Sequence, residues 1–363
     1  MGVAGRACLR YPGGVSTATS ATPLASTAVT RFLHVANGDS TTGTIHEAGL
    51  PGTLSVWADV LHDGPVPGGL PDDELLPIRA KFLAGGSSAA GEGAGDGDPT
   101  DVAAALMRWR AAIQDTSAYD ELVLWYEHDL FDQLNLIQLL AWLGQRPPEG
   151  SLVSGKRVSL ICIGSFPGRD HFKGLGELTP AELAPLLDTR QPVSEAQYAL
   201  ATRAWDAFRA SDPRALDALV RGAGTDADMS ALPFLEAALR RHLEEYPWTT
   251  DGLSRTERHL MQLAGAAPIA FADAFPRMHD GETAFYIADL SLLAVIERLA
   301  AASPPLMVSG NALTLTDTGR AVLAGELDRV SHCGIDRWLG GVHIQGRCAT
   351  WRWNPERQRI VLA

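Results

Sequence analysis

Short apolar runs alternate with polar breaks in the first half of the chain, and this pattern predicts a parallel α/β sheet. Four runs have the length and composition of buried strands, over residues 32–36, 54–61, 122–126 and 157–163. Helical patterns separate them, over residues 72–83, 101–113 and 130–143. Strands that alternate with helices indicate an α/β Rossmann-like parallel sheet domain over residues 31–175.

The second half of the chain has the periodicity of helices. Capping boxes at Thr179–Glu182 and Ser194–Gln197 open two helices of a helical region, residues 176–250. In residues 251–363, helical runs precede a short hairpin that turns at Ser309–Asn311, and another helix follows. This order predicts a winged-helix-like C-terminal domain, which closes with a terminal hairpin of residues 351–353 and 360–362.

Two segments lack the pattern of packed structure. Residues 1–30 are rich in Ser, Thr, Ala and Gly and contain no acidic residue, whereas residues 84–100 are a low-complexity stretch rich in Gly and Ala. We expect a disordered extension in the first case and a flexible insertion in the second.

Charge argues against binding to nucleic acid or to an anionic membrane. The net charge is −13, and such partners require clustered Lys and Arg. Residues 251–363 contain 11 Arg and no Lys against 12 Asp plus Glu, so the winged-helix-like domain lacks the positive surplus of DNA-binding modules. We therefore expect a protein partner, rather than DNA, at this domain.

The cysteines and the hydrophobic runs predict a cytoplasmic protein. Cys8, Cys162, Cys333 and Cys348 form no CxxC pair and have no His at metal-binding spacing. No apolar run is long enough to cross a membrane. A reducing compartment is the expected location.

Polar side chains gather where the predicted strands end. Ligands bind outside the carboxyl ends of strands in open α/β sheets, so these residues form a candidate site. We predict Asp39, Glu127 and His128 as catalytic residues. Oxygen ligands from separate strand ends suit Mg²⁺ or Mn²⁺, and Asp39, Asp59 and Asp129 are the predicted metal ligands.

The same residues also have a purely local interpretation. Asp39 and Asp129 have the positions of helix caps, and Asp132 that of a first-turn partner of the helix dipole. Asn37 and Gly38 are typical turn residues. Each polar residue would then stabilise its own strand-to-helix junction.

A basic loop supplies the second half of the candidate site. The stretch Ser165–Gly176 contains Arg169, His171 and Lys173 among glycines, a composition that can hold a phosphate or carboxylate. The predicted ligand-binding residues are Asn37, Gly38, Ser40, His62, Arg169, His171 and Lys173. No P-loop and no GxGxxG motif is present, so a nucleoside triphosphate or dinucleotide has no motif support.

Three segments carry a family resemblance. Residues 33–40 (LHVANGDS), 57–65 (WADVLHDGP) and 127–133 (EHDLFDQ) resemble the bacterial family catalogued as domain of unknown function 1835. Residues 253–257 (LSRTE) and 334–341 (GIDRWLGG) are similar to the companion C-terminal family numbered 3658. The resemblance implies a bacterial protein and carries no established activity.

Two functions follow from these patterns. The first is binding of a small phosphorylated or anionic ligand at the strand ends, with metal-assisted hydrolysis or group transfer as the expected chemistry. The alternative is a regulatory or adaptor protein that uses the winged-helix-like domain for protein contacts. Ser165 is a weak candidate nucleophile, since Gly164–Gly168 does not form a GxSxG elbow. The residues leave open whether the protein is an enzyme.

Overall fold

The computed structural model describes residues 30–85, 98–145, 152–153, 155–223 and 228–363. Arg31–Ala363 form one compact unit. The predicted extension, apart from Thr30, and most of the predicted insertion lie outside the described residues. Ala84, Pro99 and Thr100 were expected in the insertion, but they belong to helices. Among the described residues, no helix is both long and apolar enough to span a membrane.

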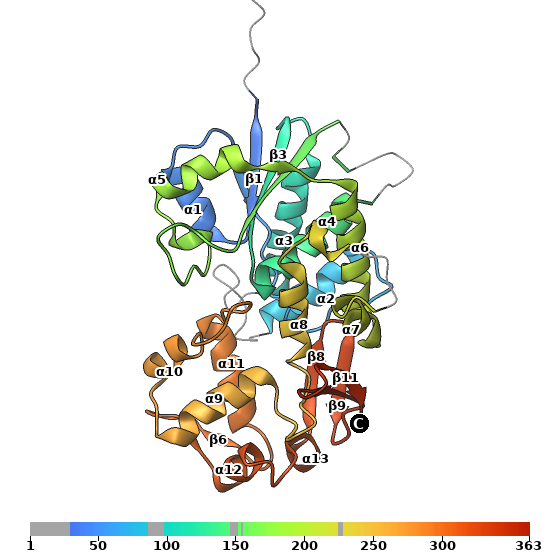
Figure 1. The fold of residues 1–363 in the computed structure, drawn as a ribbon. Coiled ribbons are helices and arrows are strands. Elements are labelled where there is room, and N and C mark those ends of the chain that lie inside the picture. Colours follow the sequence, from blue (N-terminus) through green and yellow to red (C-terminus); the bar gives the residue numbers. More distant parts are fainter. Residues whose placement is uncertain (1–29, 86–97, 146–151, 154, 224–227) are drawn as a thin grey trace, which may run out of the picture. The chain divides into compact units, whose positions relative to one another are not determined.

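A five-stranded, mostly parallel sheet is the centre of the α/β part (Figure 1). In spatial order the strands are β2 (Thr53–Val56), β1 (Phe32–Ala36), β3 (Glu121–Glu127), β4 (Arg157–Ile163) and β5 (Gln191–Pro192). Strands β1 to β4 are parallel, and β5 pairs antiparallel with β4. The predicted α/β sheet is confirmed.

The strand order creates a switch point between β1 and β3. The chain leaves β1 towards β2 on one side and later returns to β3 on the other side. Ala36 at the end of β1 lies beside Val56 of β2 and Trp125 of β3, so three strands finish at one edge. Helices α1 (Asp39–Glu47) and α4 (Leu130–Leu143) start just past this edge.

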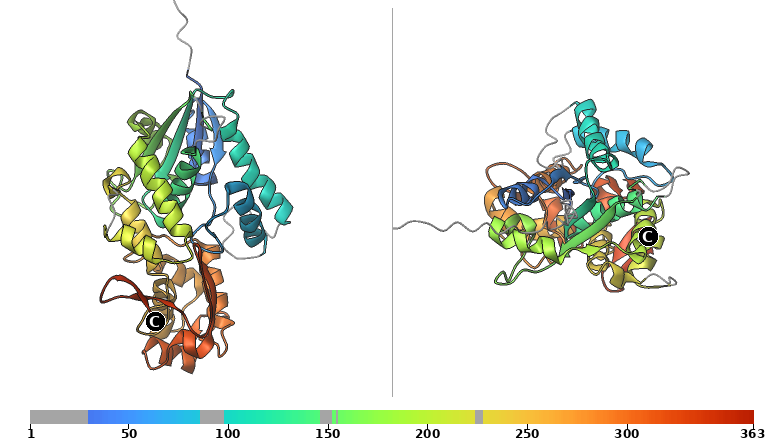
Figure 2. Two further views of the ribbon diagram at one scale, coloured as in Figure 1. Left: turned by 90° about the vertical axis from the view of Figure 1, so that its right-hand side faces the viewer. Right: turned by 90° about the horizontal axis from the view of Figure 1, so that it is seen from above.

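Alternate residues of the strands pack against helices on opposite faces of the sheet. Val123 and Trp125 of β3 pack on the face that α1 and α5 (Pro180–Leu183) cover, with Leu175 and Leu183 in the same apolar cluster (Figure 1). Leu122, Leu124 and Tyr126 pack with α4 and α6 (Glu195–Arg209) on the opposite face. The pair α2 (Asp72–Ala84) and α3 (Pro99–Gln114) lies beside the β2 edge (Figure 2).

The predicted strand over residues 54–61 is wrong beyond Val56. After one more sheet hydrogen bond, from the Trp57 N–H to the Ala36 carbonyl, the chain leaves the sheet. The Asn135 side chain then accepts from the Asp59 N–H (2.8 Å) and donates to the Asp59 carbonyl (2.9 Å). A side chain of α4 thus replaces the neighbouring strand, which local hydrophobicity could not predict.

Helices follow the sheet over most of residues 176–250, as predicted. They are α5, α6, α7 (Arg214–Val220) and α8 (Leu235–Leu243), with short 3-10 turns η1 (Leu175–Glu177), η2 (Ala184–Thr189) and η3 (Met229–Ala231). Both predicted capping boxes are formed, at Thr179 and Ser194. Strand β5 differs from the prediction, because it extends the sheet beyond residue 175 along the edge of β4.

The C-terminal residues combine helices with small antiparallel sheets. The elements are α9 (Arg255–Ala266), α10 (Phe271–Arg277), α11 (Asp289–Ala300), β6 (Met307–Val308), β7 (Thr314–Leu315), α12 (Asp317–Leu323), α13 (Arg329–Cys333), β8 (Ile335–Leu339), β9 (Val342–Gly346), β10 (Trp351–Asn354) and β11 (Arg359–Leu362). The two predicted hairpins, β6–β7 and β10–β11, are confirmed. The hairpin β8–β9 was not predicted; it turns at Gly340, whose φ of 59° suits glycine.

Candidate functional site

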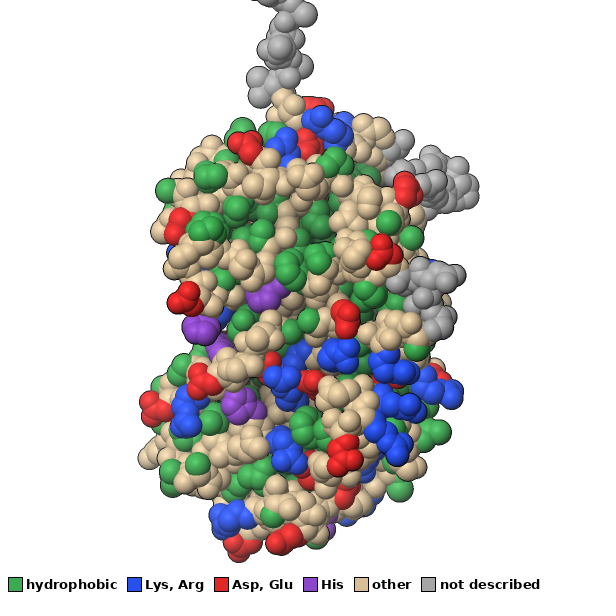
Figure 3. Space-filling view, in the orientation of Figure 1, with side chains coloured by type: hydrophobic (Ala, Val, Ile, Leu, Met, Phe, Trp, Pro, Cys, Tyr) green, Lys and Arg blue, Asp and Glu red, His purple; other side chains and the backbone are tan. Residues whose placement is uncertain are grey.

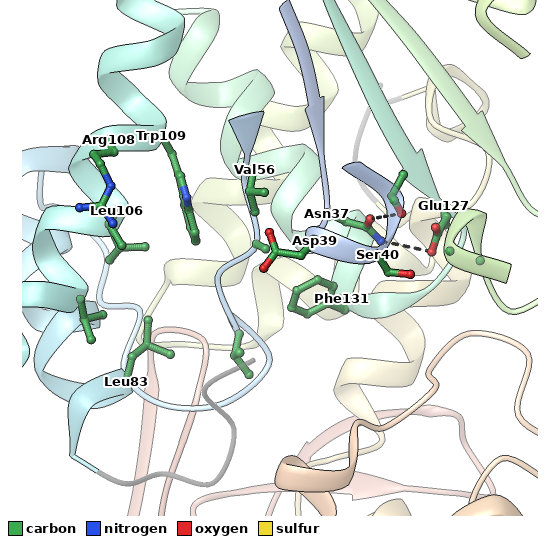
Figure 4. A pocket seen from close by; sticks show the side chains of 18 of the residues that line it. Asn37, Asp39, Ser40, Val56, Leu83, Leu106, Arg108, Trp109, Glu127 and Phe131 are labelled. Carbon is green, nitrogen blue, oxygen red and sulfur yellow. Dashed lines mark hydrogen bonds between the residues drawn. The ribbon is translucent and has the colours of Figure 1, made fainter. Parts of the chain in front are cut away.

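A cavity of about 660 Å³ opens at the carboxyl ends of β1 and β3. Its polar wall follows strands β1, β3 and β4 and comprises Asn37, Asp39, Ser40, Glu127, Lys173 and Glu177. Its other wall is largely apolar and comes from α3 and from residues after β2 (Figure 4). The cavity therefore lies at the switch point of the sheet, where parallel α/β proteins bind ligands.

The turn between β1 and α1 is held by Asn37. Its Oδ1 accepts from Thr41 Oγ1 (3.0 Å), and its Nδ2 donates to Asp132 Oδ2 (2.8 Å) and Glu127 Oε2 (3.3 Å). The local interpretation of Asp39 as a helix cap is wrong, because Gly38 is the N-cap and Asp39 is the first residue of α1. Asp39 and Ser40 are exposed and line the cavity, so the positive end of the α1 dipole borders it.

Three buried carboxyl groups lie at the end of β3, on Glu127, Asp129 and Asp132. The Glu127 N–H donates to Asp132 Oδ1 (2.9 Å), and the Asp132 N–H donates to Asp129 Oδ1 (2.9 Å). Asp129 is the N-cap of α4, as the local interpretation predicted. Of the three, Glu127 lines the cavity.

Burial of these carboxyl groups favours their protonated forms. It raises the pKa of Glu127 to about 8, with a further contribution from the charge of Asp129. It raises the pKa of Asp129 to about 6. It also raises the pKa of Asp132, and the like charges of Glu127 and Asp129 raise that pKa further. Glu127 therefore carries a proton at neutral pH and can donate it towards the cavity.

The loop before η1 closes over Glu127. The Leu175 N–H donates to Glu127 Oε1. A Cβ atom at Gly174 would overlap the Glu127 carboxyl group, and one at Gly176 would lie 2.6 Å from Ser40 Oγ. Glycine at these two positions lets the backbone approach the ends of β1 and β3 closely.

The predicted basic loop contributes one cation to the cavity. Lys173 lines it, whereas Arg169 pairs with Glu182 (2.8 Å) and His171 is exposed away from it. Among the described residues, no carboxylate lies within ion-pair distance of Lys173. Its Nζ contacts His279 Nδ1 (3.2 Å) and lies 6.0 Å from the centre of the Tyr286 ring.

Two predicted histidines lie outside the cavity. His62 packs against the rings of Phe131 and Phe285, and burial lowers its pKa to about 4. His128 packs against Phe172, Phe234 and Tyr286, and burial lowers its pKa as well. Both are therefore neutral at pH 7, and their rings serve the packing between elements.

The predicted metal ligands are not brought together. Asp59 is buried in a bidentate ion pair with Arg79 (Nη2–Oδ1 2.8 Å), and Asp129 caps α4. In the described part of the chain, no three His, Cys, Asp or Glu side chains are grouped to hold a metal ion. Asp39, Asp59 and Asp129 therefore do not fit one ion, and binding of Mg²⁺ or Mn²⁺ stays a prediction.

No protein-family model matches this chain, and no curated protein matches it. The resemblance of its motifs to families of unknown function stays a prediction, so the chemistry of the site is the basis for a function.

The sequence pattern missed the wall formed by α3. Val102, Ala105, Leu106 and Trp109 recur at the spacing of one helical face and line the cavity, and Arg108 lies beside them. That spacing was visible in the sequence, but an apolar stripe more often packs into a core. A hint was available in the topology, because ligands bind in the crevice at a switch point, and α2 and α3 follow β2, a strand at that crevice.

Proposed function

We propose that this protein binds a small organic anion in the cavity between β1 and β3. We also infer that the sheet domain is Rossmann-like and that residues 251–363 form a winged-helix-like domain. The observation that carries the proposal is Lys173, an ammonium group at the switch-point cavity that lacks a carboxylate partner among the described residues. An unpaired cation beside a helix N-terminus is the arrangement that recognises phosphate and carboxylate groups.

The other charged residues of the cavity indicate which further groups the ligand carries. Lys173 is partly buried, whereas Arg108 at the α3 wall is an exposed cation, and Asp39 and Glu177 are exposed carboxylates. Glu127 contributes no charge at neutral pH because burial raises its pKa. The ligand should thus carry an anionic group for Lys173 and hydroxyl or amino donors for Asp39, a combination typical of phosphorylated metabolites.

The same wall supports acid–base chemistry. We infer that protonated Glu127 acts as a general acid and that the exposed carboxylate of Asp39 acts as a general base, since both residues line the cavity. Hydrolysis or transfer of the anionic group is the reaction class that we propose for this pair. His128, the third predicted catalytic residue, is excluded from this role by its place among aromatic rings outside the cavity.

Lys173→Gln is expected to weaken the binding of inorganic phosphate roughly 10- to 100-fold, since a hydrogen bond to a charged group contributes about 1.5–3 kcal/mol. Isothermal titration would measure the affinity. The matched control is Lys81→Gln, because Lys81 is exposed on α2 and lies outside the cavity. The proposal fails if wild-type protein binds neither phosphate nor phenyl phosphate at millimolar concentration, or if Lys173→Gln binds them as tightly as Lys81→Gln.

A second candidate function is favoured by the contacts of residues 278–288, the connector between α10 and α11. The Ala284 carbonyl accepts from the Leu130 N–H (2.7 Å), and Asp129 accepts from the Tyr286 N–H. His279 Nε2 donates to the Ile287 carbonyl (3.0 Å), which leaves Nδ1 to accept from Lys173. A ligand that binds Lys173 would therefore break the contact between Lys173 and His279 and change the connector. This is expected of a sensor in which ligand binding changes the conformation of a C-terminal module.

The partner of such a module would be a protein. Seven of the eleven arginines in residues 251–363 are paired with carboxylates, among them Arg298 with Asp63, Arg329 with Glu257 and Arg337 with Glu245. On the face shown in Figure 3, acidic side chains lie among the basic ones that gather over the lower part. Arginines that are already paired with carboxylates bind the phosphate backbone of a nucleic acid poorly.

Saturating phenyl phosphate is expected to raise amide hydrogen exchange in residues 278–288, because the ligand competes with His279 for the Lys173 ammonium. Hydrogen-exchange mass spectrometry would follow this change. In His279→Ala, which lacks the link, phenyl phosphate should still bind but leave exchange in residues 278–288 unaltered. Unchanged exchange of the connector in ligand-saturated wild-type protein would count against the sensor function.

A further inference from the structure

The cavity has two chemically different halves. Ser40 and Glu127 belong to the polar half, whereas Val56, Leu106 and Trp109 belong to the apolar half (Figure 4). Lys173 lines the same cavity and adds a cation to its polar wall. An inorganic anion bound at Lys173 would contact the polar half alone. The apolar half therefore requires a ligand with a matching apolar part, or it would stay in contact with water.

The apolar half is a slot between α3 and the segment after β2. Leu106 and Val60 are buried and belong to one apolar cluster, which forms the floor and fixes the position of α3. Trp109 packs against this cluster but remains only partly buried, and it lines the cavity. Among the described residues, no hydrogen-bond partner is found for its indole. A half-exposed Trp next to a cavity gains contact area when a flat group covers it.

The chain between α2 and α3 does not carry a side chain suited to this slot. Residues 86–97 read GSSAAGEGAGDG, without an aromatic or a large aliphatic residue. The group that covers Trp109 must therefore come from a ligand or from elsewhere in the chain, and the continuity of the slot with the polar half favours the ligand.

We propose that the ligand carries a flat aromatic or heteroaromatic ring that lies in the slot against Trp109, while its anionic group reaches Lys173. This inference rests on the proposed function, and it narrows the ligand from any small anion to an aryl or heteroaryl anion. Offset stacking on an indole supplies affinity that a sugar phosphate or inorganic phosphate lacks. Trp109 is thus a specificity-determining residue.

The test compares inorganic phosphate, ribose 5-phosphate, phenyl phosphate and adenosine 5′-monophosphate by isothermal titration. Wild-type protein is expected to bind the two ring-bearing compounds at least roughly 10-fold more tightly than the other two. Trp109→Ala should abolish that preference and leave the affinity for inorganic phosphate unchanged, and Trp109→Phe should retain most of it. Trp338→Ala is the matched control, since Trp338 is also partly buried but stacks on His343 outside the cavity.

A second variant keeps the test valid if Trp109→Ala does not fold. Ala105 lines the slot from the same helix and is only partly buried, so Ala105→Phe should fill the slot from within. It is expected to lower the affinity for phenyl phosphate roughly to that for inorganic phosphate. Equal affinities of all four compounds for wild-type protein, or a preference that survives both variants, would overturn the inference while leaving anion binding intact. Failure of all four compounds to bind would instead overturn the proposed function.

Discussion

Arg79→Ala should lower the free energy of unfolding by about 3–5 kcal/mol, because it leaves the Asp59 carboxylate buried without its partner. Both side chains are almost completely buried, and the guanidinium makes three hydrogen bonds to the Asp59 carboxylate. It also donates to the carbonyls of Val60 (2.9 Å) and Asp63 (2.9 Å). Chemical denaturation monitored by circular dichroism would measure the loss.

Two further variants show whether the loss of stability in Arg79→Ala comes from the unpaired, buried Asp59 carboxylate. Arg31→Ala removes an exposed ion pair with Asp120 and should change stability little, because solvent screens such pairs. The double replacement Asp59→Asn with Arg79→Met removes both charges and should recover part of the loss. A loss in Arg79→Ala no larger than that in Arg31→Ala would mean that the segment after β2 does not depend on this pair.

Local signals in the sequence predicted most elements of the sheet. The strands Phe32–Ala36 and Arg157–Ile163 and the helix Leu130–Leu143 have the predicted bounds. Each is a mostly apolar run with a polar stop or a cap at its end, so the nearest residues decide its limits. Where the limits depend on a distant side chain, as for Asp59 with Asn135, the sequence pattern failed.

The candidate site was predicted only in part, because some of its residues are decided by partners that are distant in the sequence. Asn37, Asp39 and Glu127 meet at one cavity because parallel strands finish at one edge of the sheet, which topology alone implies. Which polar residues remain available there depends on partners that spacing does not reveal. Asp59 is paired with Arg79, and Arg169 is paired with Glu182. Asp59 and Arg169 are therefore not available in the candidate site. Lys173 remains available because such a partner is missing among the described residues.

The carboxyl group at the cavity opposes folding at the pH where the site would work. Glu127 is buried beside Asp129 and Asp132, and its neighbours Asn37 and Leu175 supply hydrogen bonds but no charge. An acid whose pKa is raised in the folded state lowers stability as the pH rises from its pKa in the unfolded chain to its pKa in the folded protein. Such an arrangement is common where a proton donor is needed at neutral pH, and it gives the site a measurable signature in stability.

Glu127→Gln should reduce the loss of stability between pH 6.5 and pH 8. The pKa of Glu127 lies at about 8 in the folded protein against an ordinary value of 4.5, so the folded state holds a proton that the unfolded chain has released. Stability therefore falls as the pH rises from about 4.5 to 8, by about 1.4 kcal/mol per pH unit for one proton. Gln does not ionise, and its Oε1 can keep the hydrogen bond from Leu175. Denaturation series of both proteins at several pH values would measure the difference.

The pH window and the control decide what this comparison means. Below pH 6.5, His62 has the opposite effect, because its lowered folded pKa makes stability rise with pH there. Glu47→Gln, on the exposed surface of α1, should keep the wild-type pH profile. Above pH 8 the ionised Glu127 would also repel an anion in the cavity, so phosphate should bind wild-type protein more weakly while Glu127→Gln keeps its affinity. Parallel stability profiles of wild-type protein and Glu127→Gln from pH 6.5 to 8 would show that Glu127 is already ionised in the folded state and cannot serve as the acid.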